Sequence, residues 1–202
     1  MSKDSVDAIV RYQAQDSGVL IMSSKDMFLY GKAKTEYKKM SVEAPQIYFD
    51  QASQTIRAKG LPGPDTTADF ANKVHFDQDE MKTISDSMAY NMKTGKGITR
   101  NTFYQDGEIF LNARSLKKVD SNEVYAMYAR FTTCNLDTPH YAFRARRMKV
   151  INNKLGVTGR VYPEIESVPI PMIFVPFGIF PLIQGRHSGV LLPSFTSRED
   201  FG

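Results

Sequence analysis

The stretch SVEAPQIYFD, residues 41–50, combines alternating apolar side chains with one proline, and this combination decides the fold class. Val42 and Ala44 share one phase of the alternation, Ile47 and Phe49 share the other, and the proline separates the two pairs. A period of two is typical of a strand with one buried face, because successive side chains of a strand point to opposite faces. Proline removes a hydrogen-bond donor from the ladder, so a phase change at a proline predicts a bend or bulge. We therefore predict a bent strand here.

The same arrangement of strand, corner and strand recurs along the chain. After a polar turn at 51–54, Ile56 and Ala58 alternate with two basic residues. Similar alternation flanks turns centred near residues 95, 121 and 153, at uneven spacing, so the repeat is loose and not a strict solenoid. Very little of the chain has the i, i+3, i+4, i+7 spacing of an amphipathic helix. The chain is therefore predicted to be all-β.

Each predicted sheet has an apolar face that needs a cover. No helix is predicted to provide it, so the remaining arrangements are two facing sheets or one antiparallel sheet folded over like a taco. Residues 60–80, GLPGPDTTADFANKVHFDQDE, are rich in proline, glycine and acidic residues and are interpreted as a long loop or an insertion. No other linker divides the chain convincingly.

Cysteine and histidine usage argues against metal and cofactor chemistry. The 202 residues include one cysteine, Cys134, and three histidines. A single cysteine excludes an internal disulfide and a multi-cysteine zinc site, and the histidines lack HxxxH or HExxH spacing. The glycines near residue 95 lie in a predicted turn, without a phosphate-binding GxGxxG or GxxxxGK[ST] pattern. No metal and no cofactor are predicted.

The positive charge is local. Lys and Arg exceed Asp and Glu by 26 to 22, and the excess lies from residue 140 onward. Such a surplus suits an anionic partner but falls short of the clustered basic footprint of a nucleic-acid-binding protein. A solvated basic surface is an equally good interpretation.

Two residue pairs raise the alternative of an enzyme. Cys134 and His140 lie close together in the sequence, but no third orienting group or oxyanion-hole motif accompanies them. Glu164 and Glu166 share a strand phase, as the paired carboxylates of a carbohydrate-active jelly-roll or β-solenoid enzyme would. Prolines flank this pair, so solvated strand positions are the favoured interpretation.

Residues 168–182, VPIPMIFVPFGIFPL, form the most apolar stretch of the chain, with four prolines. Each proline would remove a helical hydrogen bond and clash with the preceding turn, so a transmembrane helix is excluded. The segment is predicted to be extended, edge-like and bent. We expect it to be partly exposed in this chain.

Several sequence motifs resemble one family. FTTC at 131–134, PHYAF at 139–143, VPIPMIFVPFGIFP at 168–181 and HSGVLLPSF at 187–195 occur in the order typical of the LPS-assembly protein LptD (OstA-like, organic solvent tolerance) family. Upstream, YGKAKTEYKKMSVEAPQIYFD at 30–50 and MAYNMKTGKGI at 88–98 resemble the periplasmic OstA repeats of that family. The resemblance covers almost the entire chain.

The resemblance implies a fold, a location and partners. It implies an OstA-like β-taco or half jelly roll over residues 1–165, followed by a proline-rich junction, 166–202, that leads to an outer-membrane β-barrel expected beyond this chain. Such a domain lies at the periplasmic face of the outer membrane of a Gram-negative bacterium. It receives lipopolysaccharide from an LptA-like bridge protein by edge-strand addition and passes it to the barrel and its lipoprotein plug. No enzymatic activity and no nucleic-acid binding are implied.

The resemblance also implies roles for particular residues. Acyl chains are expected on an inner face formed by Val42, Ala44, Ile47, Phe49, Ile56, Ala58, Met88, Tyr90, Met92, Ile98, Tyr125, Met127 and Phe131. Candidates for the rim that holds the phosphorylated head group are Arg144, Arg146, Arg147 and Lys149. Cys134 matches a cysteine that is disulfide-bonded to a region absent from this chain. The alternative within the same fold is a soluble LptA-like bridge protein.

Overall fold

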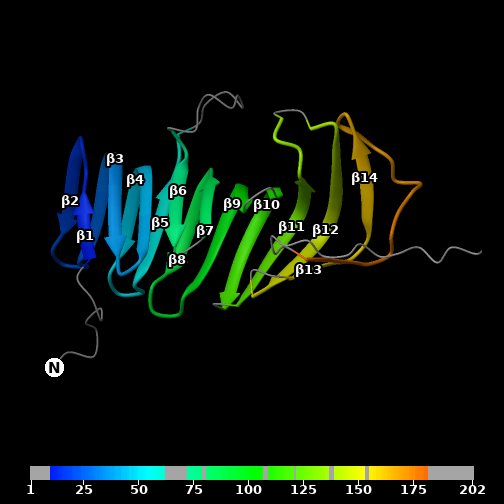
Figure 1. The fold of residues 1–202 in the computed structure, drawn as a ribbon. Coiled ribbons are helices and arrows are strands. Elements are labelled where there is room, and N and C mark those ends of the chain that lie inside the picture. Colours follow the sequence, from blue (N-terminus) through cyan, green and yellow to red (C-terminus); the bar gives the residue numbers. More distant parts are fainter. Residues whose placement is uncertain are drawn as a thin grey trace, which may run out of the picture.

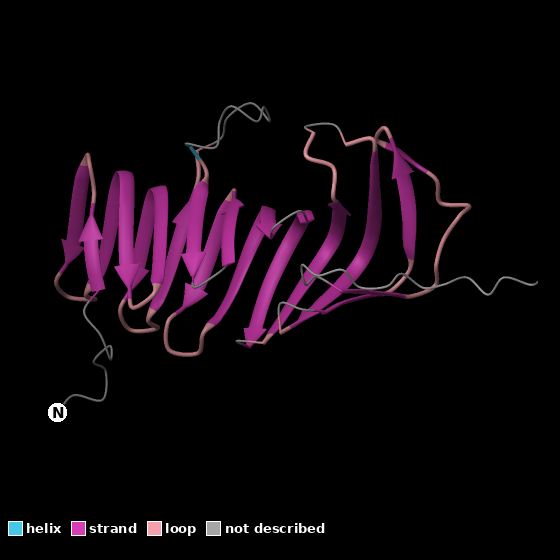
Figure 2. Cartoon of the chain, in the orientation of Figure 1, coloured by secondary structure: helices cyan, strands magenta, loops and turns pink. Residues whose placement is uncertain are grey.

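The computed structural model describes residues 10–61, 72–78, 81–106, 109–120, 122–136, 139–152 and 155–181. Within these residues almost all secondary structure is β, in strands that follow one another along the molecule (Figures 1 and 2). The strands are β1 (Val10–Gln13), β2 (Ser17–Ile21), β3 (Asp26–Tyr37), β4 (Met40–Asp50), β5 (Thr55–Lys59), β6 (Val74–Gln78), β7 (Met81–Ser85), β8 (Ser87–Asn91), β9 (Lys96–Asp106), β10 (Ile109–Asp120), β11 (Glu123–Thr132), β12 (Tyr141–Ile151), β13 (Leu155–Thr158), β14 (Val161–Ile165), β15 (Val168–Pro169) and β16 (Gly178–Pro181). The all-β prediction is confirmed. The described residues contain no helix long and apolar enough to cross a membrane.

All the strands join one antiparallel sheet that divides into two layers, because the long strands pair with different neighbours at their two ends. Residues 46–50 of β4 pair with β5, whereas residues 40–43 pair with β6. In the same way β9 pairs with both β8 and β7, and β12 pairs with both β13 and β14. We call the layer containing β2, β5, β8 and β13 layer A, and the layer containing β1, β6, β7 and β14 layer B. The predicted folded-over antiparallel sheet is therefore present.

The layers meet at a crease, where each long strand bends. In β3 the bend falls at Gly31, with a φ of 74°, and the register with β4 shifts there. Asn101 in β9 and Tyr128 in β11 also have positive φ values, of 47° and 51°. The ladder continues along the crease through the backbone of Asp86, whose carbonyl accepts a hydrogen bond from the Gly60 N–H at 2.9 Å. The crease therefore keeps its backbone groups paired while the strands change layer.

The bend predicted in β4 is confirmed by the burial of its side chains. Val42 and Ala44 are buried before Pro45, and Ile47 and Phe49 are buried after it. A bend that skips one position keeps the apolar residues of both halves on the inside. This phase change lets one strand contribute to both layers with one buried face.

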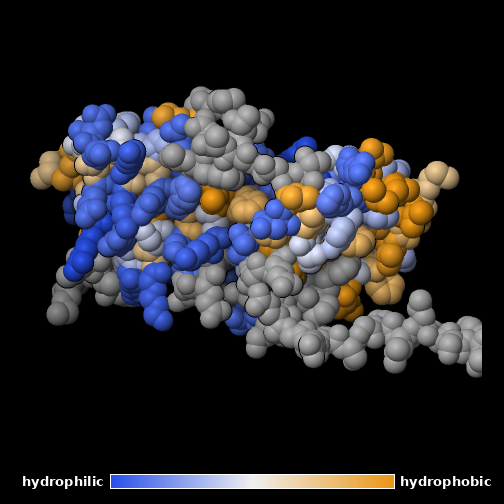
Figure 3. All heavy atoms as spheres, turned by 45° about the horizontal axis from the view of Figure 1, so that its top comes forward, coloured by the Kyte–Doolittle hydropathy of each residue, from blue (hydrophilic) through white to orange (hydrophobic). Residues whose placement is uncertain are grey.

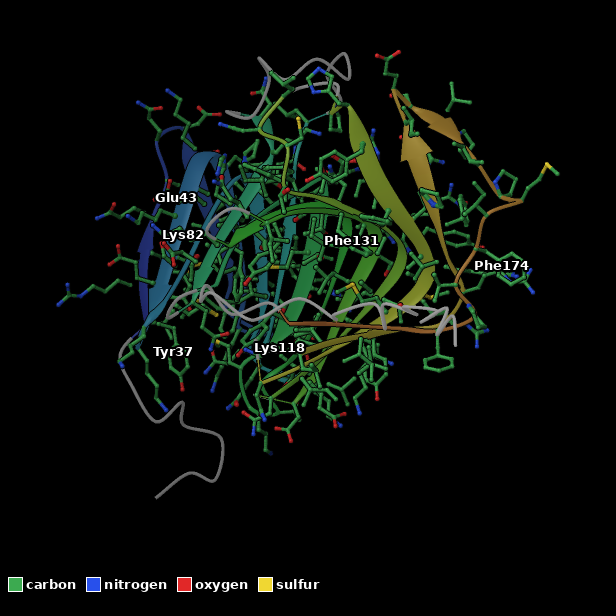
Figure 4. The ribbon with its side chains drawn as sticks, turned by 45° about the vertical axis from the view of Figure 1, so that its right-hand side comes forward. Tyr37, Glu43, Lys82, Lys118, Phe131 and Phe174 are labelled. Carbon is green, nitrogen blue, oxygen red and sulfur yellow. The ribbon has the colours of Figure 1, made fainter. Side chains whose placement is uncertain are left out.

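The core lies between the layers. One cluster spans β3 to β8 and contains side chains from both layers, and a second cluster spans β10 to β14. Aromatic rings touch across the gap, with centroids 5.6 Å apart for Phe76 and Tyr90 and 5.9 Å apart for Tyr12 and Phe49. Figure 4 shows Phe131 within the fold and Glu43 and Lys82 on its outside.

The structure corrects one part of the sequence interpretation and agrees with another. Residues 60–80 were expected to be a loop or insertion, but β6 (Val74–Gln78) lies in this stretch, with Val74 and Phe76 buried. Its two inward side chains are separated by one position, which was too short a pattern to outweigh the acidic and proline-rich surroundings. The described part of 168–182 is extended and exposed, as predicted, and short strands β15 and β16 pair with β14 and β13.

Candidate functional site

Most of the predicted inner-face residues lie in the interior. Those that are buried are Val42, Ala44, Ile47, Phe49, Ile56, Ala58, Met88, Tyr90 and Phe131. Met92 is partly buried and packs against the same cluster as the first eight. The inner faces of both layers are therefore apolar, as a hydrocarbon-binding surface requires.

Three of the predicted inner-face residues are wrongly placed. Ile98, Tyr125 and Met127 are 44%, 39% and 44% exposed. In β11 the buried residues are Val124 and Ala126 before the bend and Ala129 and Phe131 after it. The prediction treated residues 125–131 as one uninterrupted alternation and so placed Tyr125 and Met127 on the wrong face.

The sequence interpretation also missed inward residues. Leu29, Met40, Val74, Phe76, Leu111 and Ala126 are buried in the two clusters. Most of them alternate with polar neighbours, so the signal was present. It was hidden wherever a bend changed the phase within a strand.

The edge of the fold opposite the crease, where strands of the two layers end, is closed by side chains; we call this edge the mouth. The Lys118 ammonium, near the layer A end of β10, donates a hydrogen bond to Gln78 Oε1, at the layer B end of β6, at 2.8 Å. The neighbouring 51–54 turn is fixed by Ser53, whose hydroxyl donates to the Asp50 carboxylate at 2.6 Å. These bonds from Ser53 lower the pKa of Asp50. The Lys118–Gln78 hydrogen bond therefore links the two layers at the mouth, whereas apolar contacts fill the interior.

The four candidates for a head-group rim do not form one rim. Lys149 binds Glu123 at 2.7 Å, and this hydrogen bond raises the pKa of the Lys149 ammonium. Arg144 is paired with the buried carboxylate of Glu164. Arg146 and Arg147 lie where β12 bends, on the opposite side of the fold from the mouth. The spacing of these residues could not reveal this, because the bend sends successive positions to different layers.

A groove on the outer face of layer B is instead lined by three of these four residues, Arg144, Arg146 and Arg147. The groove has a volume of about 1250 Å³. Its outer-face character follows from the register, in which Asn112, Arg130 and Arg144 lie opposite one another, while their neighbours Ala113, Ala129 and Ala145 point to the core. The arginines that line the groove are Arg114, Arg130, Arg144, Arg146, Arg147 and Arg160. We call it the arginine groove.

The segment after β11 forms one wall of the arginine groove, through Cys134, Leu136 and Pro139. Cys134 has no disulfide partner among the described residues, and its Sγ lies 3.7 Å from Nδ1 of His140. The structure thus brings together the two residues considered as a nucleophilic pair. The disulfide implied by the resemblance stays a prediction.

The other considered pair, Glu164 and Glu166, does not resemble the two carboxylates of a glycosidase. Glu164 is buried between Arg130 and Arg144, whereas Glu166 is exposed in the turn after β14, with a φ of 47°. No group of three or more potential metal ligands occurs among the described residues.

Exposed apolar side chains gather at the C-terminal end of the sheet (Figure 3). Met172 is 91% exposed and Phe177 is 68% exposed, and Ile173, Phe174 and Val175 are also exposed. A contiguous exposed apolar patch is unusual for an isolated soluble domain and indicates a surface that contacts another molecule or another part of the protein.

Comparison with known proteins gives one family. A family model described as LptD protein matches residues 157–202. The chain is 26% identical over 162 residues to the LPS-assembly protein LptD of Acinetobacter baylyi, and this match covers 77% of the chain and 20% of the relative. The corresponding protein of Nitrosococcus oceani is 24% identical over 95% of the chain and 24% of its own length. The resemblance to the LptD family is confirmed.

Other matches agree on the family name. The LptD of Acinetobacter baumannii is 27% identical over 80% of the chain. The chain spans about a fifth of the length of these Acinetobacter relatives. A solved structure of LptH, the LptA homologous periplasmic component of a lipopolysaccharide transport device from Pseudomonas aeruginosa, aligns with 55% of the chain at 10% identity and a TM-score of 0.45.

Proposed function

We propose that this chain is a lipopolysaccharide-transport domain at the periplasmic face of a Gram-negative outer membrane. In this role it receives lipopolysaccharide from a bridge protein and passes it toward the rest of the parent protein. The similarity to LptD proteins supports the substrate class and the location. The work requires binding and release of a lipid, without covalent chemistry or a cofactor.

The observation that carries the proposal is a pair of apolar faces joined along the crease and held at the mouth by side-chain contacts. Acyl chains lying between the layers would be shielded from water, at about 0.8 kcal/mol per buried CH2 group. The residues proposed to line this path are the buried members of the predicted set, from Val42 in layer B to Met88 in layer A. The polar sugar part of the lipid would remain in water beyond the mouth.

Side chains of the two layers touch, so a lipid must separate the layers to lie between them. The contacts to be lost include the Phe76 and Tyr90 rings and the Lys118–Gln78 hydrogen bond. Each is worth about 0.5–1.5 kcal/mol. Burial of a few CH2 groups offsets the cost of losing these two contacts.

Photo-crosslinking tests this path with a matched pair of methionines. A photoreactive residue at Met88, which is buried, is expected to capture lipopolysaccharide in cells, as is one at Phe49. The same residue at Met127, which is exposed, is expected to capture much less. Equal capture at Met88 and Met127, or capture at Met127 alone, would reject the interior as the lipid path.

The proposed protein partners lie at the two ends of the sheet. At the N-terminal end, β2 pairs with β3 alone among the described strands and exposes Val19 and Leu20, which suits addition of a strand from an LptA-like bridge protein. At the C-terminal end, the exposed apolar segment around Met172 suits contact with the barrel and lipoprotein plug of a longer protein. Replacing Leu20 with Asp is expected to weaken bridge-protein crosslinking without changing capture of lipid at Met88.

A further inference from the structure

The arginine groove holds more positive charge than the surrounding residues neutralise. Among the described residues, the ion pairs made by its six arginines all run to Glu164, which binds Arg130 at 2.7 Å and also binds Arg144. In the part of the chain that the structure describes, Arg114, Arg146, Arg147 and Arg160 form no ion pair. Like charges on neighbouring strands repel one another, so this arrangement destabilises the unliganded sheet.

The uncompensated arginines lie on nearby strands along the crease. Arg114 lies opposite Tyr128, and Tyr128 lies opposite Arg146, because the pairs on either side of these residues are in register. Arg114 on β10 and Arg146 on β12 are thus two strand spacings, about 10 Å, apart at the backbone, a gap that two long arginine side chains can span. Guanidinium groups on these strands can therefore reach one bound anion together.

Aromatic rings orient two of the guanidinium groups. Arg114 lies over the ring of Tyr128 at 4.8 Å from the centroid, and Arg160 lies over the ring of Phe174 at 4.7 Å. Stacking on a ring uses the flat face of a guanidinium and leaves its N–H edge available for hydrogen bonds. Both edges are therefore positioned in advance of ligand binding.

Arg130 also lines the groove and is held by Glu164. Its Nε is buried and has no hydrogen-bond partner, although its terminal nitrogen is close to Glu164. A buried donor without a partner is costly unless a ligand or water satisfies it.

We propose that the arginine groove is a binding site for a phosphate ester, separate from the acyl-chain path between the layers. A phosphate group presents several acceptor oxygens and up to two negative charges, so it can bridge guanidiniums from different strands. The groove volume of about 1250 Å³ leaves room for a sugar or glycerol attached to the phosphate. The exposed rings that border the arginines provide apolar surface for that attached group.

Two probes represent the two sources of a phosphate ester. Glucose 1-phosphate, with glucose as its control, tests a soluble phosphorylated sugar by calorimetric titration of the 202-residue chain. Vesicles of phosphatidylcholine with added phosphatidylglycerol, compared with phosphatidylcholine alone, test a lipid head group by co-sedimentation. Binding is expected in at least one arm and is expected to weaken as salt is added.

The decisive comparison uses two double variants that remove the same charge. Arg114→Gln with Arg146→Gln is expected to weaken binding at least about tenfold, because each change removes charge-assisted hydrogen bonds. Arg57→Gln with Arg100→Gln removes two exposed arginines outside the groove, one of which also stacks on a tyrosine, and is expected to leave binding unchanged. If the first variant does not fold, Arg147→Gln with Arg160→Gln replaces it.

Each outcome decides the proposal. Arginine-dependent binding of either probe supports it and identifies the source. Equal binding by the two double variants, or no binding of either probe above its phosphate-free control, overturns it. Neither result bears on crosslinking at Met88, so failure here is distinguishable from failure of the proposed transport role.

Discussion

At the scale of single residues, Glu164 is the carboxylate on which the outer face of layer B depends. It is almost fully buried between Arg130 and Arg144, which lie directly opposite each other on adjacent strands. Glu164→Gln removes the negative charge that compensates the two guanidinium groups. The variant is expected to lose about 1–3 kcal/mol of unfolding free energy in urea, because two partly buried guanidiniums lose their counter-charge.

A nearby exposed pair provides the control for this prediction. Glu123 binds Lys149 at 2.7 Å, but both side chains are substantially exposed. Glu123→Gln is expected to change the unfolding free energy by less than about 1 kcal/mol. If both variants lose the same free energy, burial of Glu164 does not determine its contribution.

The burial of the Tyr12 phenol leads us to expect a loss of stability at alkaline pH. Tyr12 packs against Phe49 across the two layers, and burial raises the pKa of its phenol to about 12. The unfolded chain releases this proton near pH 10, before the folded chain does, so stability falls as pH rises from about 10 toward 12. Urea unfolding at pH 9, 10 and 11 is expected to show a shallower decline for Tyr12→Phe than for the wild-type chain. Parallel declines would mean that other groups cause the loss.

Single-residue placement was predictable in the short strands β5 and β8, where alternation is uninterrupted, and in longer strands where the sequence marks the bend. Pro45 marks the phase change in β4, and the four flanking apolar residues are placed correctly. β11 bends at Tyr128, which has a positive φ. Such a conformation is usually marked by glycine or asparagine, and a tyrosine gives no such signal in the sequence. The energy of burying Ala129 and Phe131 imposes this bend, so an interpretation based on local patterns could not find it.

At the scale of one element, the bend of β3 shows how strongly a crease position constrains its residue. Gly31 has a φ of 74°, and a Cβ added there would overlap the side chain of Asp16. Gly31→Ala is expected to lower the unfolding free energy by about 2 kcal/mol, from the left-handed conformation and from the displacement of Asp16.

The corresponding control lies at the far end of the crease. Gly159 has no heavy atom within 4 Å of an added Cβ and no positive φ. Gly159→Ala is expected to change stability by less than about 0.5 kcal/mol in the same chemical unfolding experiment. Similar losses at both glycines would show that loss of glycine itself, and not the geometry of the β3 bend, causes the effect.

At the scale of the whole molecule, the fold class and the folded-over arrangement followed from alternation and the absence of a covering helix. The positions of the charged residues on the outside of the fold did not follow from the sequence. Arg144, Arg146 and Arg147 are close in sequence and were expected at a head-group rim. In the fold they line the same groove as Arg114 and Arg160, away from the mouth. This grouping depends on long-range strand pairing, which no local pattern encodes.

The two faces of the folded sheet therefore have different chemistry. The inside carries two apolar clusters, whereas the outside of layer B carries the arginine groove. Acyl chains can reach the inside only if the layers separate, because side chains of the two layers are in contact there. Opening of the mouth is thus the molecular motion on which the proposed transport depends.

A chemical link across the mouth tests that motion. In a Cys134→Ser background, cysteines replacing Gln78 and Lys118 are joined by a short bis-maleimide, which ties layer B to layer A at the position of their 2.8 Å contact. Capture of lipopolysaccharide by a photoreactive residue at Met88 is expected to fall at least about tenfold, because the acyl chains can no longer part the layers. A second pair, replacing Glu123 and Lys149, links two strands of layer A alone and is expected to leave capture unchanged. If the cross-mouth link leaves capture at the level of this second pair, lipid reaches Met88 without opening the mouth, and entry from an end of the sheet replaces it as the route.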